Sequence, residues 1–288
     1  MSHFTVMVIG NDPEKELAPY NENIQVDEYK ENVLDIIDIQ YFVEHYTNNS
    51  DEVSDKEKEE NLKLTFDELY EKYGEDWNNN SWRKDEDGVY YEYSTRNPKS
   101  KWDWYELGGR WNNFLKLKDG SYCDSALKGD IDFDGMVQDA EDDALETYEN
   151  FRKYCGGEIP KLEYKWDDIN DVNNNKFNEM SFHQKRDFYK NQPSLLKLES
   201  LRNKLEFDMF FFYELEHFQC TIEEYIERSK KERIMTFALV KNGEWYESAK
   251  MSWFSITSNE NKNWEEEFHK LLYETSDDEL ISIYDCHI

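Results

Sequence analysis

The chain has 288 residues, a length that suits one large domain or two smaller ones. Its 65 Asp and Glu against 34 Lys and Arg give a net charge of -31, which excludes a surface that binds the nucleic acid backbone, because phosphate contacts need cations. This charge suits a protein that meets a basic partner or imitates a polyanion. Aromatic residues make up 16% of the chain, and acidic disordered segments are poor in them, so we expect a folded protein with an aromatic core.

Cysteine usage and the first residues predict a cytosolic protein. The four cysteines show neither CxxC spacing nor the density of a disulfide framework. The first ten residues lack a basic stretch, and their apolar run is too short for a signal peptide or a membrane span. We therefore expect a protein of a reducing cytoplasm that does not contact a membrane.

The first third of the chain predicts one strand and one helix. Residues 4–9 (FTVMVI) are rich in β-branched residues and are followed by turn residues, which predicts a buried strand. Residues 48–60 are almost purely polar and predict a loop or the solvated start of a helix. Residues 65–73 open with a capping box and predict a helix that stops at Gly74.

The middle of the chain changes from strand patterns to helix patterns. Residues 89–123 contain Gly-Gly and Asp-Gly pairs between apolar runs, and such pairs supply the positive φ of hairpin turns. We therefore predict a β-meander there. Residues 139–154 show helical periodicity, and apolar residues recur at helical spacing again over residues 193–231.

The last part of the chain returns to strands. Residues 233–240 and 245–255 are separated by an Asn-Gly turn, which predicts a hairpin. An amphipathic helix over residues 263–273 and a final strand over residues 280–288 complete the order.

Together these elements predict an α+β fold. An antiparallel sheet would be formed with both chain termini, and a largely helical insertion would interrupt it. The sheet domain would comprise residues 1–134 and 232–288, and the helical insertion or arm would comprise residues 135–231.

Residues 102–111 (WDWYELGGRW) are the densest candidate for recognition. Trp, Tyr and Arg dominate interface energies. This predicts a partner-binding site made of Trp102, Trp104, Tyr105, Arg110 and Trp111, with both of the first two rings on one strand face. The alternative, favoured by how strands use aromatics, is a hairpin whose rings fill the core and whose Asp103 pairs with Arg110.

An acidic stretch follows that resembles a calcium loop. Asp130, Asp132, Asp134 and Glu141, with Gly135 between them, match the EF-hand pattern. Carboxylates at this spacing converge on a hard cation, so calcium is a possible cofactor here. No convincing incoming helix precedes the stretch, however. The alternative is an acidic turn that caps the following helix.

Signatures of other chemistry are missing from the sequence. No GxSxG, SxxK, Walker loop or GxGxxG pattern occurs, so the sequence does not favour an enzyme. His3 and His287, with Cys286, would approach one another if the terminal strands pair, which would suit zinc, but two histidines near a sheet edge is the simpler interpretation. Acidic runs such as residues 139–143 suit either nucleic acid mimicry or solvated helix starts.

Three stretches together carry a resemblance: MSHFTVMVIG at residues 1–10, NPKSKWDWYELGGRW at residues 97–111 and KGDIDFDGM at residues 128–136. The chain resembles a family of bacteriophage-encoded anti-defense proteins, the inhibitors of the bacterial Gabija complex. The resemblance covers the N-terminal half best, and the usage of Asn, Lys, Glu and Tyr suits an AT-rich phage genome. Within residues 160–230 we find no stretch that we can assign to this resemblance.

The resemblance implies a non-enzymatic inhibitor in the host bacterial cytoplasm. Several copies would assemble around the Gabija nuclease and helicase-like complex and keep DNA from the nuclease. It implies self-association into a homo-oligomer and no required cofactor, and it transfers no catalytic residue to this chain. The alternatives are a calcium-binding module built on the acidic loop, an acidic DNA mimic directed at another nuclease, and an enzyme acting on a nucleotide.

Overall fold

The computed structural model describes residues 2–49, 53–79, 81–171, 174–205, 214–252 and 256–288. It confirms the predicted α+β class. The chain forms two compact units, one of Met1–Glu16 with Tyr105–Ile288, and one of Leu17–Trp104. We call them the sheet unit and the inserted unit. The predicted insertion, residues 135–231, belongs by its contacts to the sheet unit, and the segment that separates from it lies earlier in the chain.

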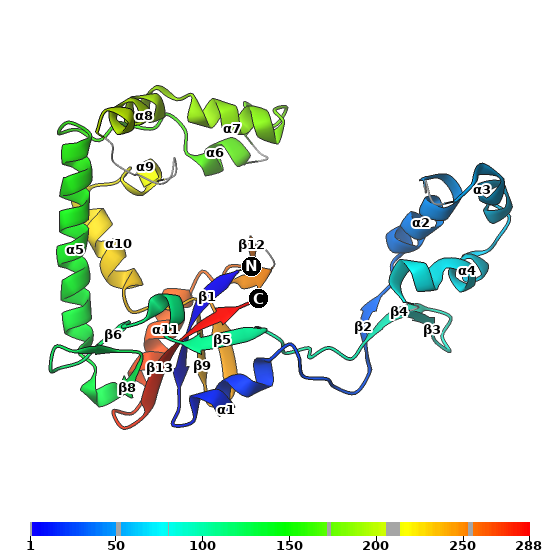
Figure 1. Ribbon diagram of the computed structural model, residues 1–288, viewed down its shortest axis with the longest axis horizontal. Coiled ribbons are helices and arrows are strands. Elements are labelled where there is room, and N and C mark those ends of the chain that lie inside the picture. Colours follow the sequence, from blue (N-terminus) through cyan, green and yellow to red (C-terminus); the bar gives the residue numbers. More distant parts are fainter. Residues whose placement is uncertain (1, 50–52, 80, 172–173, 206–213, 253–255) are drawn as a thin grey trace. The chain divides into compact units, whose positions relative to one another are not determined.

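The sheet unit is built on a six-stranded sheet of order β10-β9-β1-β13-β5, with β8 also paired to β13 (Figure 1). Two further pairs, β6 with β7 and β11 with β12, lie outside it. The strands of the unit are β1 (His3–Ile9), β5 (Trp104–Leu107), β6 (Leu115–Lys116), β7 (Tyr122–Cys123), β8 (Ser125–Leu127), β9 (Ala238–Lys241), β10 (Glu244–Glu247), β11 (Lys250–Ser252), β12 (Ile256–Ser258) and β13 (Leu280–His287).

Both chain ends enter the sheet, as the sequence predicts. Strand β1 pairs with β13 in antiparallel register from His3 opposite His287 to Ile9 opposite Ile281. On its other side β1 pairs with β9 in parallel, so the sheet is mixed and not purely antiparallel. More than 220 residues separate these two strands in the sequence, so no short turn forces β9 to run against β1.

The main core lies on one face of this sheet. Alternate residues of β1 and β13 contribute Met7, Ile9, Ile281 and Ile283, because successive strand side chains point to opposite faces. Helix α11 (Trp264–Tyr273) covers them with Trp264, Phe268 and Leu272, spaced four residues apart. Strand β1 is buried from Phe4 to Ile9, which agrees with its unbroken apolar sequence.

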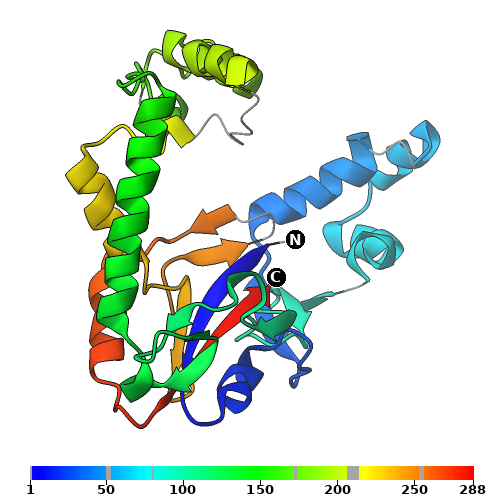
Figure 2. The same ribbon diagram turned by 60° about the vertical axis from the view of Figure 1, so that its left-hand side comes forward.

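A long helix, α5 (Phe133–Tyr154), joins this core to a second one. Met136 near its start packs in the sheet core, whereas Tyr148 and Phe151 near its end pack in an aromatic helical core. Helix α10 lies beside α5 (Figures 1 and 2). The remaining helices of the sheet unit are α1 (Pro13–Leu17), η3 (Gly109–Trp111), η4 (Lys128–Asp130), α6 (Trp166–Asn170), α7 (Phe182–Lys190), α8 (Pro193–Leu205), α9 (Glu214–His217) and α10 (Ile222–Glu232).

The inserted unit has its own small sheet and its own core. Its elements are η1 (Ala18–Tyr20), β2 (Tyr29–Val33), α2 (Ile36–Glu44), the π-helical turn η2 (His45–Asn49), α3 (Asp55–Asn61), α4 (Phe66–Asn78), β3 (Trp82–Lys84) and β4 (Tyr90–Ser94). The strand order is β2-β4-β3. The core is aromatic: Phe42 is fully buried, and Tyr46 stacks on Tyr73 with ring centroids 4.1 Å apart.

Several predicted elements are corrected at their ends or in their pairing. The capping box at Thr65 is confirmed, but α4 runs past Gly74 to Asn78 and ends where Asn79 adopts the left-handed conformation. The predicted meander over residues 89–123 does not form, because β4 pairs within the inserted unit and β5 joins the large sheet. The Asn242-Gly243 hairpin is confirmed for β9 and β10, and part of its predicted second strand, residues 253–255, lies outside the described residues.

Candidate functional site

The structure separates the two tryptophans that the sequence placed on one strand face. Trp102 is 4% exposed, and its indole Nε1 donates to the Leu17 carbonyl oxygen at 3.2 Å. This hydrogen bond joins the first residue of the inserted unit to one of its last residues. Trp104 is 47% exposed at the start of β5. Trp102 precedes that strand and bridges to Asn21 of the inserted unit, which is why strict alternation fails here.

The rest of the tryptophan-rich segment packs on the sheet unit. The Tyr105 ring meets the Tyr284 ring edge to face with centroids 5.4 Å apart, and Trp111 packs against the sheet core. Arg110 is exposed, and its backbone N–H, not its guanidinium, donates to Asp285. Trp104 and Arg110 are thus the exposed members of this segment, whereas Trp102 is buried and Trp111 packs against the sheet core. A role of these residues in partner binding stays a prediction.

The acidic residues of the calcium pattern lie along a helix start. Asp130 ends η4, Asp132 caps α5 by accepting the Gly135 N–H at 2.9 Å, and Asp134 lies in the first helical turn. Glu141 lies two turns further and pairs with Lys230 at 3.2 Å. Among the described residues there is no group of three or more His, Cys, Asp or Glu side chains that would hold a metal.

The strongest surface feature lies in the inserted unit and was missed by the sequence analysis. Four large apolar side chains at the end of β2 and along α2 are exposed to solvent: Val33 is 59% exposed, Ile36 71%, Ile37 68% and Tyr41 63%. We call these four residues the apolar patch. Ile37 and Tyr41 are one helical turn apart and therefore adjacent on α2. A cluster of exposed apolar side chains is typical of a surface that binds a partner.

The local fold explains why the apolar patch faces outward. Asp35 caps α2, and its carboxylate accepts from the backbone N–H groups of Ile37 and Asp38 in a reciprocal capping box. This fixes the helix rotation so that Phe42, fully buried, faces the aromatic core. Ile36 and Ile37 then fall on the opposite side, because one helix face cannot hold every apolar residue of the run LDIIDIQYF.

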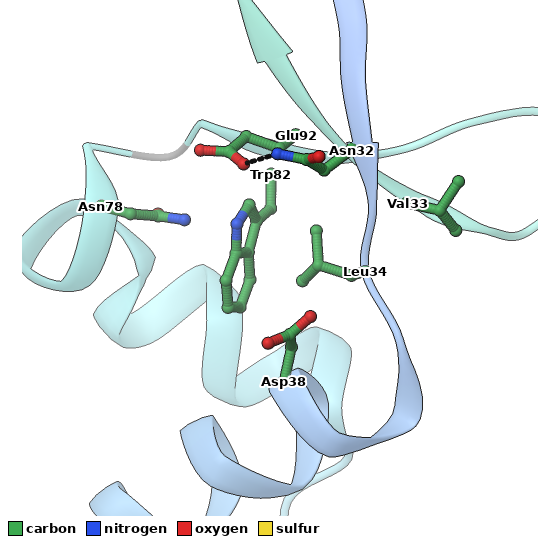
Figure 3. Close-up of a pocket in the computed structure, with 7 residues that line it drawn as sticks. All are labelled: Asn32, Val33, Leu34, Asp38, Asn78, Trp82 and Glu92. Carbon is green, nitrogen blue, oxygen red and sulfur yellow. Dashed lines mark hydrogen bonds between the residues drawn. The ribbon is translucent and has the colours of Figure 1, made fainter. Parts of the chain in front are cut away.

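A pocket of about 410 Å³ lies next to the apolar patch (Figure 3). In Figure 3 the Trp82 ring stands between Asn78 and Leu34, and the Asp38 carboxylate approaches from below. The Asn32 side-chain amide donates to Glu92 at 2.9 Å across the upper rim. Val33 belongs to both the apolar patch and the pocket lining, so the two features form one surface.

This surface lies in a strongly acidic unit. Residues 17–104 contain 23 acidic and 10 basic side chains, a net charge of -13. Exposed acids flank the apolar patch, and we call them the acidic rim; they are Glu31, Asp35, Asp38 and Glu44. The rim is left negative because nearby cations are engaged with other acids.

Ion pairs elsewhere in the inserted unit engage its cations. Lys72 pairs with Glu57 at 3.0 Å, and Lys84 pairs with Asp67 at 2.6 Å. Hydrogen bonding from Lys84, and then from Tyr90, lowers the pKa of Asp67. Lys30 likewise pairs with Asp85. These cations therefore do not neutralise the acidic rim, and a basic partner would meet a surface with net negative charge.

The chain was compared with protein-family models, with curated proteins and with solved structures, and none of the three comparisons gave a match. Among the described residues, no helix combines the length and the apolar composition that crossing a bilayer requires.

One sequence signal would have pointed to the apolar patch. The run LDIIDIQYF at residues 34–42 carries apolar residues at more positions than one helix face can bury, so some of these side chains must stay exposed. The sequence predicted a partner-binding site in the tryptophan-rich segment instead, because the composition of that segment resembles the centre of a protein interface.

Proposed function

We propose that the protein binds a basic surface of a DNA-handling protein and blocks that surface without chemical turnover. The observation that carries the proposal is the apolar patch inside its acidic rim. Apolar side chains exposed to this extent lower the free energy of association when a partner covers them, and the acids favour a partner that normally contacts phosphate. The described residues of this surface require no cofactor for such binding.

The resemblance of the sequence to phage anti-defense proteins names the partner that we propose: the bacterial Gabija nuclease and helicase-like complex, met in the host cytoplasm. Several copies of the inhibitor would surround it and exclude DNA.

The test is co-expression of the tagged protein with an untagged Gabija complex, followed by affinity capture, measurement of the mass that elutes and a DNA cleavage assay. We expect a stoichiometric assembly that does not cleave DNA. The double variant Ile36→Asp, Ile37→Asp should weaken capture by about tenfold to a hundredfold, because it places two charges in the centre of the interface.

The matched control is Leu145→Asp, which changes an exposed apolar residue of α5 in the same way. It should leave capture unchanged. If the double variant binds as well as the wild type, the apolar patch is not the binding surface. If the wild-type protein elutes alone, the Gabija complex is not its partner.

A further inference from the structure

The pocket of Figure 3 is built on one cross-strand row of the small sheet in the inserted unit. The register places Asn32 of β2 and Trp82 of β3 on either side of Glu92 of β4. Residues directly opposite one another in a sheet share a face, so these three side chains line the same wall. Asp38 from α2 and Asn78 from the end of α4 complete the polar lining.

A bulge in β2 decides which side chain meets Glu92. The register shifts between Lys30 and Asn32, so that Glu31 is the extra residue. With regular pairing Glu31 would lie opposite Glu92, and like charges in that position repel. The bulge brings Asn32 there instead, and its amide nitrogen donates to Glu92 Oε2 at 2.9 Å. The Glu92 carboxylate is therefore held at the pocket without a neutralising charge beside it.

Three acceptor oxygens of this lining are open for a ligand. They are Glu92 Oε1, Asp38 Oδ1 and Asn32 Oδ1, and none of them has a hydrogen-bond partner among the residues that the structure describes. Asp38 uses its other oxygen, Oδ2, to accept the Asp35 N–H at 3.3 Å. Both charged side chains of the lining are acids, and neither forms an ion pair within the described part of the chain.

The cations on the neighbouring strands lie on the other face of the small sheet. The Lys30 Nζ is 4.0 Å from the centre of the Tyr91 ring. The Arg83 guanidinium carbon is 3.8 Å from the centre of the Tyr93 ring. Both rings point away from Glu92, because successive side chains of β4 alternate between the two faces. These two cations therefore do not neutralise the acids of the pocket.

The aromatic wall of the pocket is held in position by the core of the inserted unit. The Trp82 ring stacks on the Tyr70 ring with centroids 5.6 Å apart. The Trp82 backbone N–H also donates to the Tyr70 hydroxyl at 2.9 Å. A wall that is already ordered adds little entropic cost to ligand binding.

We propose that this pocket binds the guanidinium of an arginine side chain that a partner protein inserts. A guanidinium has several N–H donors and no acceptor, which matches a lining with open acceptor oxygens. Its plane stacks on an aromatic ring while its edge donates to carboxylates, and the pocket combines the Trp82 ring with Glu92 and Asp38. A volume of about 410 Å³ lies in the range of sites that bury a small ligand, so a whole arginine side chain fits.

That the arginine belongs to a protein rests on the proposed function, whereas the affinity of the pocket for a guanidinium does not. Val33 belongs to both the apolar patch and the pocket lining, so a protein that covers the patch also reaches the pocket. A surface that normally contacts phosphate carries arginines, and arginine is among the residues that dominate interface energies.

The test titrates N-acetyl-L-argininamide into the full-length protein at constant ionic strength and follows the indole N–H resonances by NMR. The variant Trp82→Phe identifies the Trp82 resonance. We expect a saturable shift of this resonance in the millimolar range of the probe. N-acetyl-L-lysinamide carries the same charge without a planar group and should bind more weakly, and the neutral N-acetyl-L-citrullinamide should not bind.

A pair of variants separates the pocket from the general charge of the chain. Glu92→Gln removes one charge and keeps an oxygen that accepts from Asn32, so it should weaken binding of the arginine compound about tenfold or more. The matched control is Glu31→Gln, which removes the same charge from the bulge residue of the neighbouring strand, outside the pocket lining. It should leave binding of the probe unchanged.

Three results would overturn the arginine pocket. Equal weakening by the two variants would mean that only the overall charge attracts the probe. No saturation up to about 50 mM probe would mean that there is no specific site. Equal binding of the lysine and arginine compounds would mean that the indole and the carboxylates do not select a guanidinium.

The arginine pocket and the proposed function fail separately. Capture of the Gabija complex without binding of the probe would remove the arginine pocket and leave the proposed function standing. Binding of the probe to the pocket without capture of the Gabija complex would keep the pocket and remove the named partner.

Discussion

At the scale of single residues, Gly109 makes the sharpest prediction for stability. Gly109→Ala combines a positive φ with a clash against the Cβ of buried Asp285. The left-handed backbone costs about 1–2 kcal/mol and overpacking adds about 1–3 kcal/mol, so we expect a loss of about 2–5 kcal/mol in the free energy of unfolding. Urea unfolding followed by tryptophan fluorescence measures this loss.

Gly120→Ala is the matched control for that variant. Gly120 also has a positive φ, but a Cβ built there would meet nothing within 4 Å. Only the backbone cost of about 1–2 kcal/mol then applies. Equal losses for the two variants would show that the close approach of the turn to Asp285 does not contribute to stability.

Asp139 gives a prediction that depends on pH. Hydrogen bonding from Lys116 at 2.7 Å, and then from Tyr122 at 2.8 Å, lowers the pKa of Asp139 below its usual value of 3.8. A carboxyl whose pKa is lowered by folding stabilises the protein above its unfolded pKa, and this contribution is lost as the pH falls through the folded value. Asp139→Asn should therefore lower the urea midpoint at pH 7, and the difference should shrink toward pH 3.

Asp143→Asn is the control for Asp139→Asn. Asp143 lies one helical turn further along α5 and is exposed, and its replacement leaves the hydrogen bonds of Lys116 and Tyr122 to Asp139 in place. Its effect on the urea midpoint should be small at both pH values. A difference between wild type and Asp139→Asn that stays constant from pH 7 to pH 3 would contradict the assigned cause.

At the scale of elements, the start of α5 distinguishes a helix cap from a metal ligand. Asp132 accepts the Gly135 N–H at 2.9 Å, which is the geometry of a cap. Asp132→Ala should lower the free energy of unfolding by about 1 kcal/mol, equally in a chelator and in millimolar calcium. The measurement is urea unfolding under the two conditions. Calcium that stabilises the wild type but not the variant would instead support the EF-hand interpretation.

Helix boundaries show how far local signals predict an element. Thr65 and Glu68 form the predicted capping box, because both partners lie within one turn and need nothing from elsewhere in the chain. Gly74 did not stop the helix, since a glycine ends a helix only when its backbone becomes left-handed. In this protein Gly74 is buried inside α4, and Asn79 adopts that conformation instead.

At the scale of the whole molecule, the charge of -31 makes a prediction about partner binding. If acids supply most of the attraction, the affinity for the proposed partner should fall about tenfold or more between about 0.05 M and 0.5 M salt, because salt screens exposed charges. Binding measured by calorimetry at both salt concentrations tests this. An affinity that barely changes would favour the apolar patch as the main anchor and would argue against nucleic acid mimicry.

The sequence by itself determined the features that depend on neighbouring residues: the buried strand over residues 4–9, the Asn242-Gly243 turn, the capping box at Thr65, the α+β class and the acidic charge. Periodicity and turn chemistry act over a few residues, so one sequence suffices to read them. The order of the elements also predicted that both chain termini enter one sheet, and the structure pairs β1 with β13 there.

Only the tertiary structure decided which distant segments meet and which side chains stay exposed. It placed β9 parallel to β1, gave residues 17–104 their own core, and left Ile36 and Ile37 in solvent. It also brought Arg110 to Asp285 across 175 residues of sequence. Such contacts depend on how elements pack, and hydrophobic periodicity fixes the buried face of an element but not its neighbour or its direction.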